Sequence, residues 1–247
     1  MNTGGSASRH VAITGATGGI GAALARQFAQ SGYLVSAIGR SRPALDDLAA
    51  SHERISAFHL ADIADGTACA DTFVKIRAAN GPVEILIAAA AIYPKAFFLD
   101  QDAGHIAEVL RTNIEGVANS VREVLPAMLE RNFGRVVIFG SLADMNPMPG
   151  SLAYSVSKGA LHSLSKGIAG EIDRDRFPNV LVNEFSPGPT RTRMSDGGHA
   201  PEDIFPMLLP LVECGSDGPH GRFFQEGKEI RIGESWKAAL KRVVLRR

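Results

Sequence analysis

The sequence predicts a doubly wound α/β fold, a three-layer arrangement in which helices cover both faces of a parallel sheet. Short apolar runs alternate with longer stretches of helical spacing along the 247 residues. Parallel strands need a crossover between them, and a helix usually supplies it. The runs are apolar throughout rather than at every second residue, which is typical of strands buried on both faces. We expect one domain, residues 1–247.

The predicted strands are short apolar runs. They are His10–Thr14, Leu34–Ile38, Ile55–Leu60, Glu84–Ala88, Arg135–Phe139 and Val180–Phe185. A first helix follows the first strand, because Leu24 and Phe28 stand four residues apart. The later predicted helices are Asp65–Ala79, Asp102–Arg131, which a break could divide, and Ala153–Arg174.

The composition excludes several classes of protein. With 26 Lys and Arg against 26 Asp and Glu, the net charge is zero, which argues against a dedicated nucleic-acid binder. Cys69 and Cys214 form no pairing pattern, and the seven His residues show no metal-ligand spacing. The start of the chain has no signal-peptide pattern, and the apolar run 85–93 is too short to span a bilayer. We therefore expect a cytoplasmic protein without metal or membrane span.

A glycine-rich loop joins the first predicted strand to the first predicted helix. It reads Thr14-Gly15-Ala16-Thr17-Gly18-Gly19-Ile20-Gly21. Glycines at such a turn let the backbone approach a pyrophosphate, and the free N–H groups of the helix N-terminus attract its charge. The context of the loop therefore predicts a dinucleotide-binding site rather than an ordinary turn.

This loop resembles that of the short-chain dehydrogenase/reductase family, in its short single-domain form. Gly15, Gly19 and Gly21 have the usual spacing, whereas Gly15, Gly18 and Gly21 fit longer relatives that modify nucleotide sugars. The chain length leaves little room for a separate substrate domain, which favours the short form. The resemblance implies a Rossmann fold over residues 10–195. The cofactor contacts that it implies in the loop are Gly15, Thr17, Gly19, Ile20 and Gly21.

The end of the second predicted strand indicates which cofactor is bound. An NAD-selecting site commonly carries an acid about 20 residues beyond the loop. Here the chain reads Gly39-Arg40-Ser41, and no acid occurs before Asp46. The guanidinium of Arg40 could pair with a 2′-phosphate, so we expect NADP rather than NAD. The resemblance adds Asp62 and Ile63 beside the adenine, although Asp62 could equally cap a helix.

Tyr154 and Lys158 stand four residues apart in a predicted helix and so share one face. A free tyrosine has a pKa of about 10. One cation near 4 Å in a partly screened site supplies about 4 kcal/mol, which would lower the pKa of the phenol by ~3 units. Lys158, helped by an oxidised nicotinamide, is therefore expected to activate Tyr154. Such pairs also arise by chance on many helices, so the spacing alone is weak evidence.

Further matches to the family strengthen this interpretation. Ser141 precedes Tyr154 by 13 residues, the usual family spacing, and would polarise a substrate carbonyl. Asn113 matches the asparagine that holds a water in a proton relay with the lysine. The resemblance thus implies a catalytic set of Ser141, Tyr154, Lys158 and Asn113. The other cofactor contacts that it implies are Ala89, Asn113, Tyr154, Lys158, Pro187, Gly188, Thr190 and Thr192.

The activity implied is hydride transfer between NADPH and a carbonyl carbon, or the reverse oxidation of an alcohol. Tyr154 would be the general acid in reduction and the general base in oxidation. The substrate would be a small molecule, and the segment of about 193–215 would form an apolar lid, unless it packs in the core or against a subunit. We expect a homodimer or homotetramer. Two alternatives stay open: an NADP(H)-binding sensor without turnover, and a nucleotide-sugar-modifying relative.

Two regions depart from the family pattern. Ala88-Ala89-Ala90-Ala91 stands where relatives have Asn-Asn-Ala-Gly, so the methyl of Ala91 could crowd the nicotinamide ribose. The usual C-terminal end is not recognisable, although Phe223 and Phe224 could form a last strand. The tail of about 233–247 is basic and amphipathic, which indicates a helix packed on its own domain or a subunit, or a membrane-surface helix.

Overall fold

The structure, a computed structural model, describes residues 8–231, and the amphipathic tail of the sequence analysis lies outside them. Its strands form a single sheet with the order β3-β2-β1-β4-β5-β6-β7-β8. The strands are β1 (His10–Thr14), β2 (Leu34–Gly39), β3 (Ile55–His59), β4 (Ile85–Ala88), β5 (Gly134–Phe139), β6 (Val180–Ser186), β7 (Phe223–Gln225) and β8 (Lys228–Ile230). Every pairing from β3 to β7 is parallel, so the predicted doubly wound sheet is confirmed.

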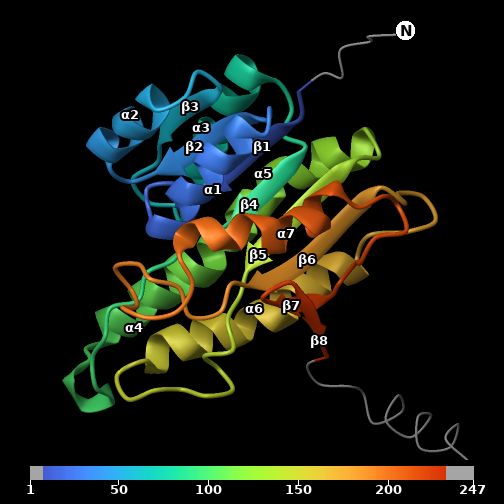
Figure 1. Cartoon of the computed structure of the whole chain (residues 1–247). Coiled ribbons are helices and arrows are strands. Elements are labelled where there is room, and N and C mark those ends of the chain that lie inside the picture. Colours follow the sequence, from blue (N-terminus) through green and yellow to red (C-terminus); the bar gives the residue numbers. More distant parts are fainter. Residues whose placement is uncertain (1–7, 232–247) are drawn as a thin grey trace, which may run out of the picture.

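The helices cover both faces of this sheet (Figure 1). They are α1 (Gly19–Gln30), α2 (Arg42–Ala50), α3 (Gly66–Asn80), α4 (Ala103–Leu110), α5 (Gly116–Glu130), α6 (Leu152–Gly170) and α7 (Ile204–Glu213). Short 3₁₀ turns lie at Phe98–Asp100 and Pro201–Asp203, and a π turn, η2 (Arg111–Glu115), joins α4 to α5. One apolar core lies under α1, α2 and α7, and a second lies under α3, α5 and α6. This is the three-layer arrangement that the sequence predicts.

Helices α2 and α7, strand β8 and the end of α6 differ from the prediction. Helix α2 was not predicted, because its apolar pattern consists of Leu45 and Leu48, which both turn into the core. Strand β8 runs antiparallel to β7, since Glu226 and Gly227 turn the chain back with positive φ. The stretch after Gly170 is a loop rather than helix, because α6 ends there.

The order of the strands fixes where a ligand can bind. Parallel strands β1 and β4 are neighbours, but the chain leaves them in opposite directions, toward β2 and toward β5. Loops that follow such strands diverge and open a crevice at the carboxyl ends. Within residues 8–231, no helix is long and apolar enough to cross a membrane.

Candidate active site

The glycine loop and the segment after β4 meet at this crevice. Gly15 has φ +73°, and a Cβ added to it would stand 2.8 Å from Cα of Ala90 and 2.9 Å from the carbonyl oxygen of Ala89. Helix α1 begins at Gly19 without a side-chain cap, so its first N–H groups are open to a ligand. The glycines thus keep a cradle of bare backbone, and its donors suit a pyrophosphate.

A second loop closes over this cradle from the far side of the crevice. The segment Pro187–Thr192 follows β6, and a Cβ added to Gly19 would stand 3.0 Å from Cγ2 of Thr192. Thr190 is buried, and its hydroxyl donates to the carbonyl oxygen of Gly188. Gly19 and Thr192, which are far apart in the sequence and were both expected at the cofactor, therefore lie together.

Arg40 lies at the end of β2, beside the glycine loop. The side chain of Thr17 lies against Gly39, because a Cβ added to Gly39 would stand 2.7 Å from Cγ2 of Thr17. The guanidinium of Arg40 is exposed, and its carbonyl oxygen receives a hydrogen bond from His59 Nε2 at 3.1 Å. The arginine is thus free to meet an anion next to the loop.

Asp62 and Ile63 occupy the turn after β3. The Asp62 carboxylate receives a hydrogen bond from the N–H of Ala64 at 2.8 Å, and the helix cap is Asp65 instead. The side chain of Ile63 is buried in the core under α5. Any contact of Ile63 with an adenine would therefore use its backbone.

Ser141 and Tyr154 meet at the carboxyl end of β5. The Ser141 hydroxyl is hydrogen-bonded to the phenol of Tyr154, and it receives a hydrogen bond from the N–H of Ala143 at 3.1 Å. The ring of Tyr93, which follows β4, stacks on Tyr154 with centroids 4.4 Å apart. The phenol is therefore held on two sides, by a hydroxyl and by an aromatic face.

Lys158 lies one helical turn beyond Tyr154, as predicted. Its ammonium is buried, 5.6 Å from the centre of the Tyr154 ring, and donates a hydrogen bond of 2.7 Å to the carbonyl oxygen of Phe139. Burial lowers the pKa of Lys158 to about 8, although the charge of Glu184 opposes this. The ammonium is therefore close to losing its proton in mildly alkaline solution.

The expected lowering of the phenol pKa is wrong for the ligand-free protein. Burial raises the pKa of Tyr154 to about 12; the Ser141 hydrogen bond opposes this and Tyr93 adds to it. The cause is that the ammonium of Lys158 points to a backbone carbonyl, so desolvation of the phenolate dominates. At neutral pH the phenol therefore keeps its proton.

Asn113 lies in the π turn η2 and is fully buried. Its side-chain oxygen accepts from the N–H of Ile92 at 2.8 Å, and its amide donates to Ile92 and to the hydroxyl of Ser157, each at 3.0 Å. The side chain thus ties the segment after β4 to α6. Its predicted part in a proton relay stays a prediction.

The four alanines Ala88–Ala91, at the end of β4 and after it, are joined to β1 by a hydrogen bond from a backbone N–H. The N–H of Ala90 donates to the hydroxyl of Thr14 at 3.3 Å, which joins this segment to the end of β1. Ala91 does not have the positive φ that would require glycine. The backbone of this chain is thus compatible with alanine at position 91.

Comparison with known proteins identifies this arrangement. A model of the short chain dehydrogenase family matches residues 9–202. The chain belongs to the short-chain dehydrogenase/reductase family. It is an oxidoreductase, and family members bind NAD(P).

Several relatives of this short-chain dehydrogenase/reductase are curated oxidoreductases. The oxidoreductase UcpA of Escherichia coli strain K12 is 32% identical over 82% of this chain and 78% of its own. The acetoacetyl-CoA reductase of Rhizobium meliloti is 31% identical over 85% of this chain and 86% of its own. A solved oxidoreductase of the same family from Burkholderia thailandensis superposes with a TM-score of 0.78, at 27% identity, over 90% of this chain and 92% of that one.

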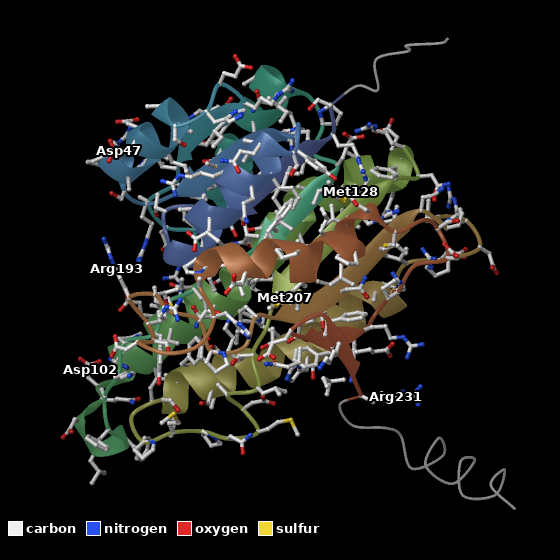
Figure 2. The ribbon with its side chains drawn as sticks, viewed as in Figure 1. Asp47, Asp102, Met128, Arg193, Met207 and Arg231 are labelled. Atoms are coloured by element: carbon white, nitrogen blue, oxygen red, sulfur yellow. The ribbon has the colours of Figure 1, made fainter. Side chains whose placement is uncertain are left out.

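Part of the segment expected to form an apolar lid in this short-chain dehydrogenase/reductase is a core helix, α7. Ile204, Leu208 and Leu211 of α7 are buried with Phe28 of α1. Figure 2 shows Met207 of α7 at the centre of the molecule, whereas Arg193 lies at its edge. Core packing was the stated alternative, and it holds for α7 because its apolar side chains face the sheet. The lid stays a prediction for the rest of the segment.

Three residues near the site were not predicted from the sequence. They are Tyr93, His162 and Glu184. Tyr93 stands in a run of apolar residues without a recognisable motif. The available signals were Glu184 inside an apolar strand and His162 one turn beyond Lys158 in the same helix.

Proposed function

We propose that this protein is an NADPH-dependent carbonyl reductase, or runs the reverse alcohol oxidation, with Tyr154 as general acid and base. The observation that carries the proposal is the phenol of Tyr154, hydrogen-bonded to Ser141 with the Lys158 ammonium 5.6 Å from its ring. The side chains of Ser141, Tyr154 and Lys158 lie where the carboxyl ends of the strands open a crevice.

The cradle at the glycine loop fits a dinucleotide. Bare backbone at Gly15 and the uncapped start of α1 suit the pyrophosphate, and exposed Arg40 suits a 2′-phosphate. Residues of the second loop, Pro187, Gly188, Thr190 and Thr192, would lie along the nicotinamide half, together with Ala89. Bound NADPH would supply a hydride to the carbonyl carbon.

The residues of the chain would manage the oxygen of the substrate. The hydroxyl of Ser141 would donate to the carbonyl oxygen, and the phenol of Tyr154 would pass its proton to that oxygen as negative charge develops. Burial raises the pKa of Tyr154 to about 12, so the phenol holds its proton at neutral pH until the substrate oxygen becomes negative enough to take it. Lys158 would hold the ribose and stabilise the resulting phenolate, and Asn113 would carry the relay that returns the proton.

A substrate panel tests this proposal. NADPH oxidation with a set of ketones, aldehydes and 3-oxoacyl thioesters should show turnover with at least one class. Acyl thioesters belong in the panel because the related protein of Rhizobium meliloti is an acetoacetyl-CoA reductase. NADPH binding without oxidation across the whole panel would favour the sensor alternative instead. The expected oligomer and the cytoplasmic location stay predictions.

Arg40 should select the cofactor. Replacement by glutamate places a carboxylate where the 2′-phosphate of NADPH would lie, so affinity for NADPH should fall by about tenfold to a hundredfold. Affinity for NADH should stay the same or rise, because a carboxylate can accept from the ribose hydroxyl. Calorimetric titration of both cofactors measures the ratio. Arg42→Glu, in the first turn of α2, is a nearby control, and an unchanged ratio in Arg40→Glu would remove Arg40 from the site.

A further inference from the structure

A carboxylate occupies a core position of strand β6. Val180 and Val182 belong to the core under α6, and Glu184 shares their face because alternate residues of a strand point the same way. The side chain of Glu184 is 1% exposed. Burying a carboxylate is costly unless it is paired. Glu184 therefore needs a charged partner, and the fold supplies one.

His162 on α6 is that partner. Its Nδ1 lies 2.8 Å from one oxygen of Glu184 and 2.9 Å from the other, and Ser165 donates to the same carboxylate at 3.1 Å. On its far side, Nε2 lies 3.4 Å from the carboxylate of Asp144. Burial disfavours the imidazolium, but the hydrogen bonds and charges of Glu184 and Asp144 outweigh it and raise the pKa of His162. Glu184, His162 and Asp144 thus form a triad of two carboxylates and one imidazole, in which Glu184 and His162 are buried and Asp144 is partly exposed.

The triad lies beside the backbone segment that Lys158 contacts. The carboxylate of Glu184 lies against Gly140, where an added Cβ would collide with its oxygen. Lys158 donates to the carbonyl oxygen of Phe139, the preceding residue, so the ammonium and the carboxylate flank one peptide group. Lys158 and His162 also stand one helical turn apart on α6.

We propose that Glu184 is a positioning residue for Lys158: the triad holds a net negative charge beside the ammonium and keeps it protonated. This proposal rests on the proposed function, in which Lys158 must be charged to hold the ribose and stabilise the phenolate. Without Glu184, desolvation alone would act on the pKa of Lys158, which is already lowered to about 8.

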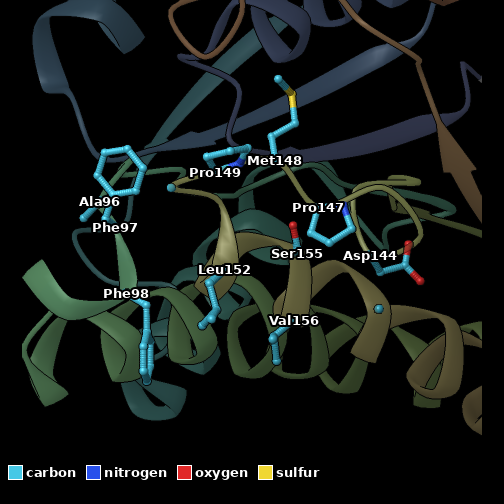
Figure 3. Close-up of a pocket in the computed structure, with 12 residues that line it drawn as sticks. Ala96, Phe97, Phe98, Asp144, Pro147, Met148, Pro149, Leu152, Ser155 and Val156 are labelled. Atoms are coloured by element: carbon cyan, nitrogen blue, oxygen red, sulfur yellow. The ribbon is translucent and has the colours of Figure 1, made fainter.

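Aromatic rings lie next to both Lys158 and the triad. Tyr154 lies on α6 with His162, and the ring of Tyr93 stacks on the ring of Tyr154. Phe223 of β7 packs edge-on against the imidazole of His162, with ring centroids 4.9 Å apart. Asp144 reaches the surface, since it lines a pocket of about 580 Å³ formed by the Pro147–Gly150 segment and the outer face of α6 (Figure 3). The triad is therefore connected to this pocket through Asp144.

Glu184→Gln tests the proposal, because it keeps the shape of the side chain and removes its charge. Wild-type affinity for NADPH should fall as the pH rises through about 8, where Lys158 loses its proton. In Glu184→Gln the same fall should occur at a pH lower by roughly one unit, since removal of a negative charge lowers the proton affinity of Lys158. Ser165→Ala is the matched control, since it removes a neutral partner of the same carboxylate and should leave the midpoint in place. Calorimetric titration across the neutral and alkaline range gives each midpoint.

A second measurement needs neither turnover nor cofactor. In the NMR spectrum of the ligand-free protein, the imidazole of His162, assigned by loss of its signal in His162→Asn, should titrate above 6.5 in the wild type and lower in Glu184→Gln. A wild-type value at or below 6.5 would overturn the charged triad. An unchanged NADPH midpoint in a folded Glu184→Gln protein would show a structural role only and overturn the proposal. If the wild type binds no NADPH, the proposed function fails, while the imidazole titration still decides the triad.

Discussion

Tyr154→Phe should reduce turnover by roughly a hundredfold to ten thousandfold and leave NADPH affinity within about twofold of the wild type. The substitution removes the only atom of Tyr154 that can give a proton to the substrate oxygen, while the ring keeps its stack with Tyr93. Steady-state rates with the best substrate of the panel and calorimetric titration of NADPH measure the two effects separately.

Tyr93→Phe is the matched control for this variant. It removes the hydroxyl of Tyr93, whose ring centroid lies 4.4 Å from that of Tyr154. This change should alter turnover only a few fold. Turnover that persists in Tyr154→Phe, or falls equally in both variants, would contradict the assignment of Tyr154 as the proton donor.

Gly15→Ala should destabilise the protein by about 2–4 kcal/mol and weaken NADPH binding at least tenfold. Two causes combine at this position. The backbone has φ +73°, which side chains disfavour, and the new methyl would stand 2.8 Å from Cα of Ala90. Either the glycine loop or the segment after β4 must move, and both line the proposed cofactor cradle.

Gly32→Ala separates the two causes. Gly32 has φ +89°, but an added Cβ there would meet no atom within 4 Å. This control should cost about 1–2 kcal/mol, the cost of the backbone conformation alone, and leave NADPH affinity unchanged. Denaturant unfolding measures both variants. Equal losses of stability in the two would mean that the contact between the loops carries no energy.

The predicted strand positions agree with the structure to within one residue at each end. This accuracy has a physical reason, since strands buried on both faces must be apolar throughout, and such runs are visible without knowledge of the fold. Helix α2 escaped prediction because it rests on two leucines, which form too short a pattern for helical periodicity to emerge.

The candidate site was predicted in part. Motifs in sequence order identified Ser141, Tyr154 and Lys158, and the structure brings them together at one end of the sheet. In the ligand-free protein the pKa of Tyr154 is raised rather than lowered, because spacing on a helix does not reveal where the Lys158 ammonium points or how deeply the phenol is buried. The same holds for α7, whose apolar residues suit both a lid and a core until the sheet beneath them is known.

The sequence alone determined the fold class, the family and the residue types available for chemistry, because periodicity and short motifs are local properties of the chain. Only the tertiary structure decided which charges act on one another. Glu184 comes from β6, His162 from α6 and Asp144 from the segment before it, and they become neighbours only when the helix packs on the strand. Electrostatic effects depend on distance and burial, and both arise from contacts between residues that are remote along the chain.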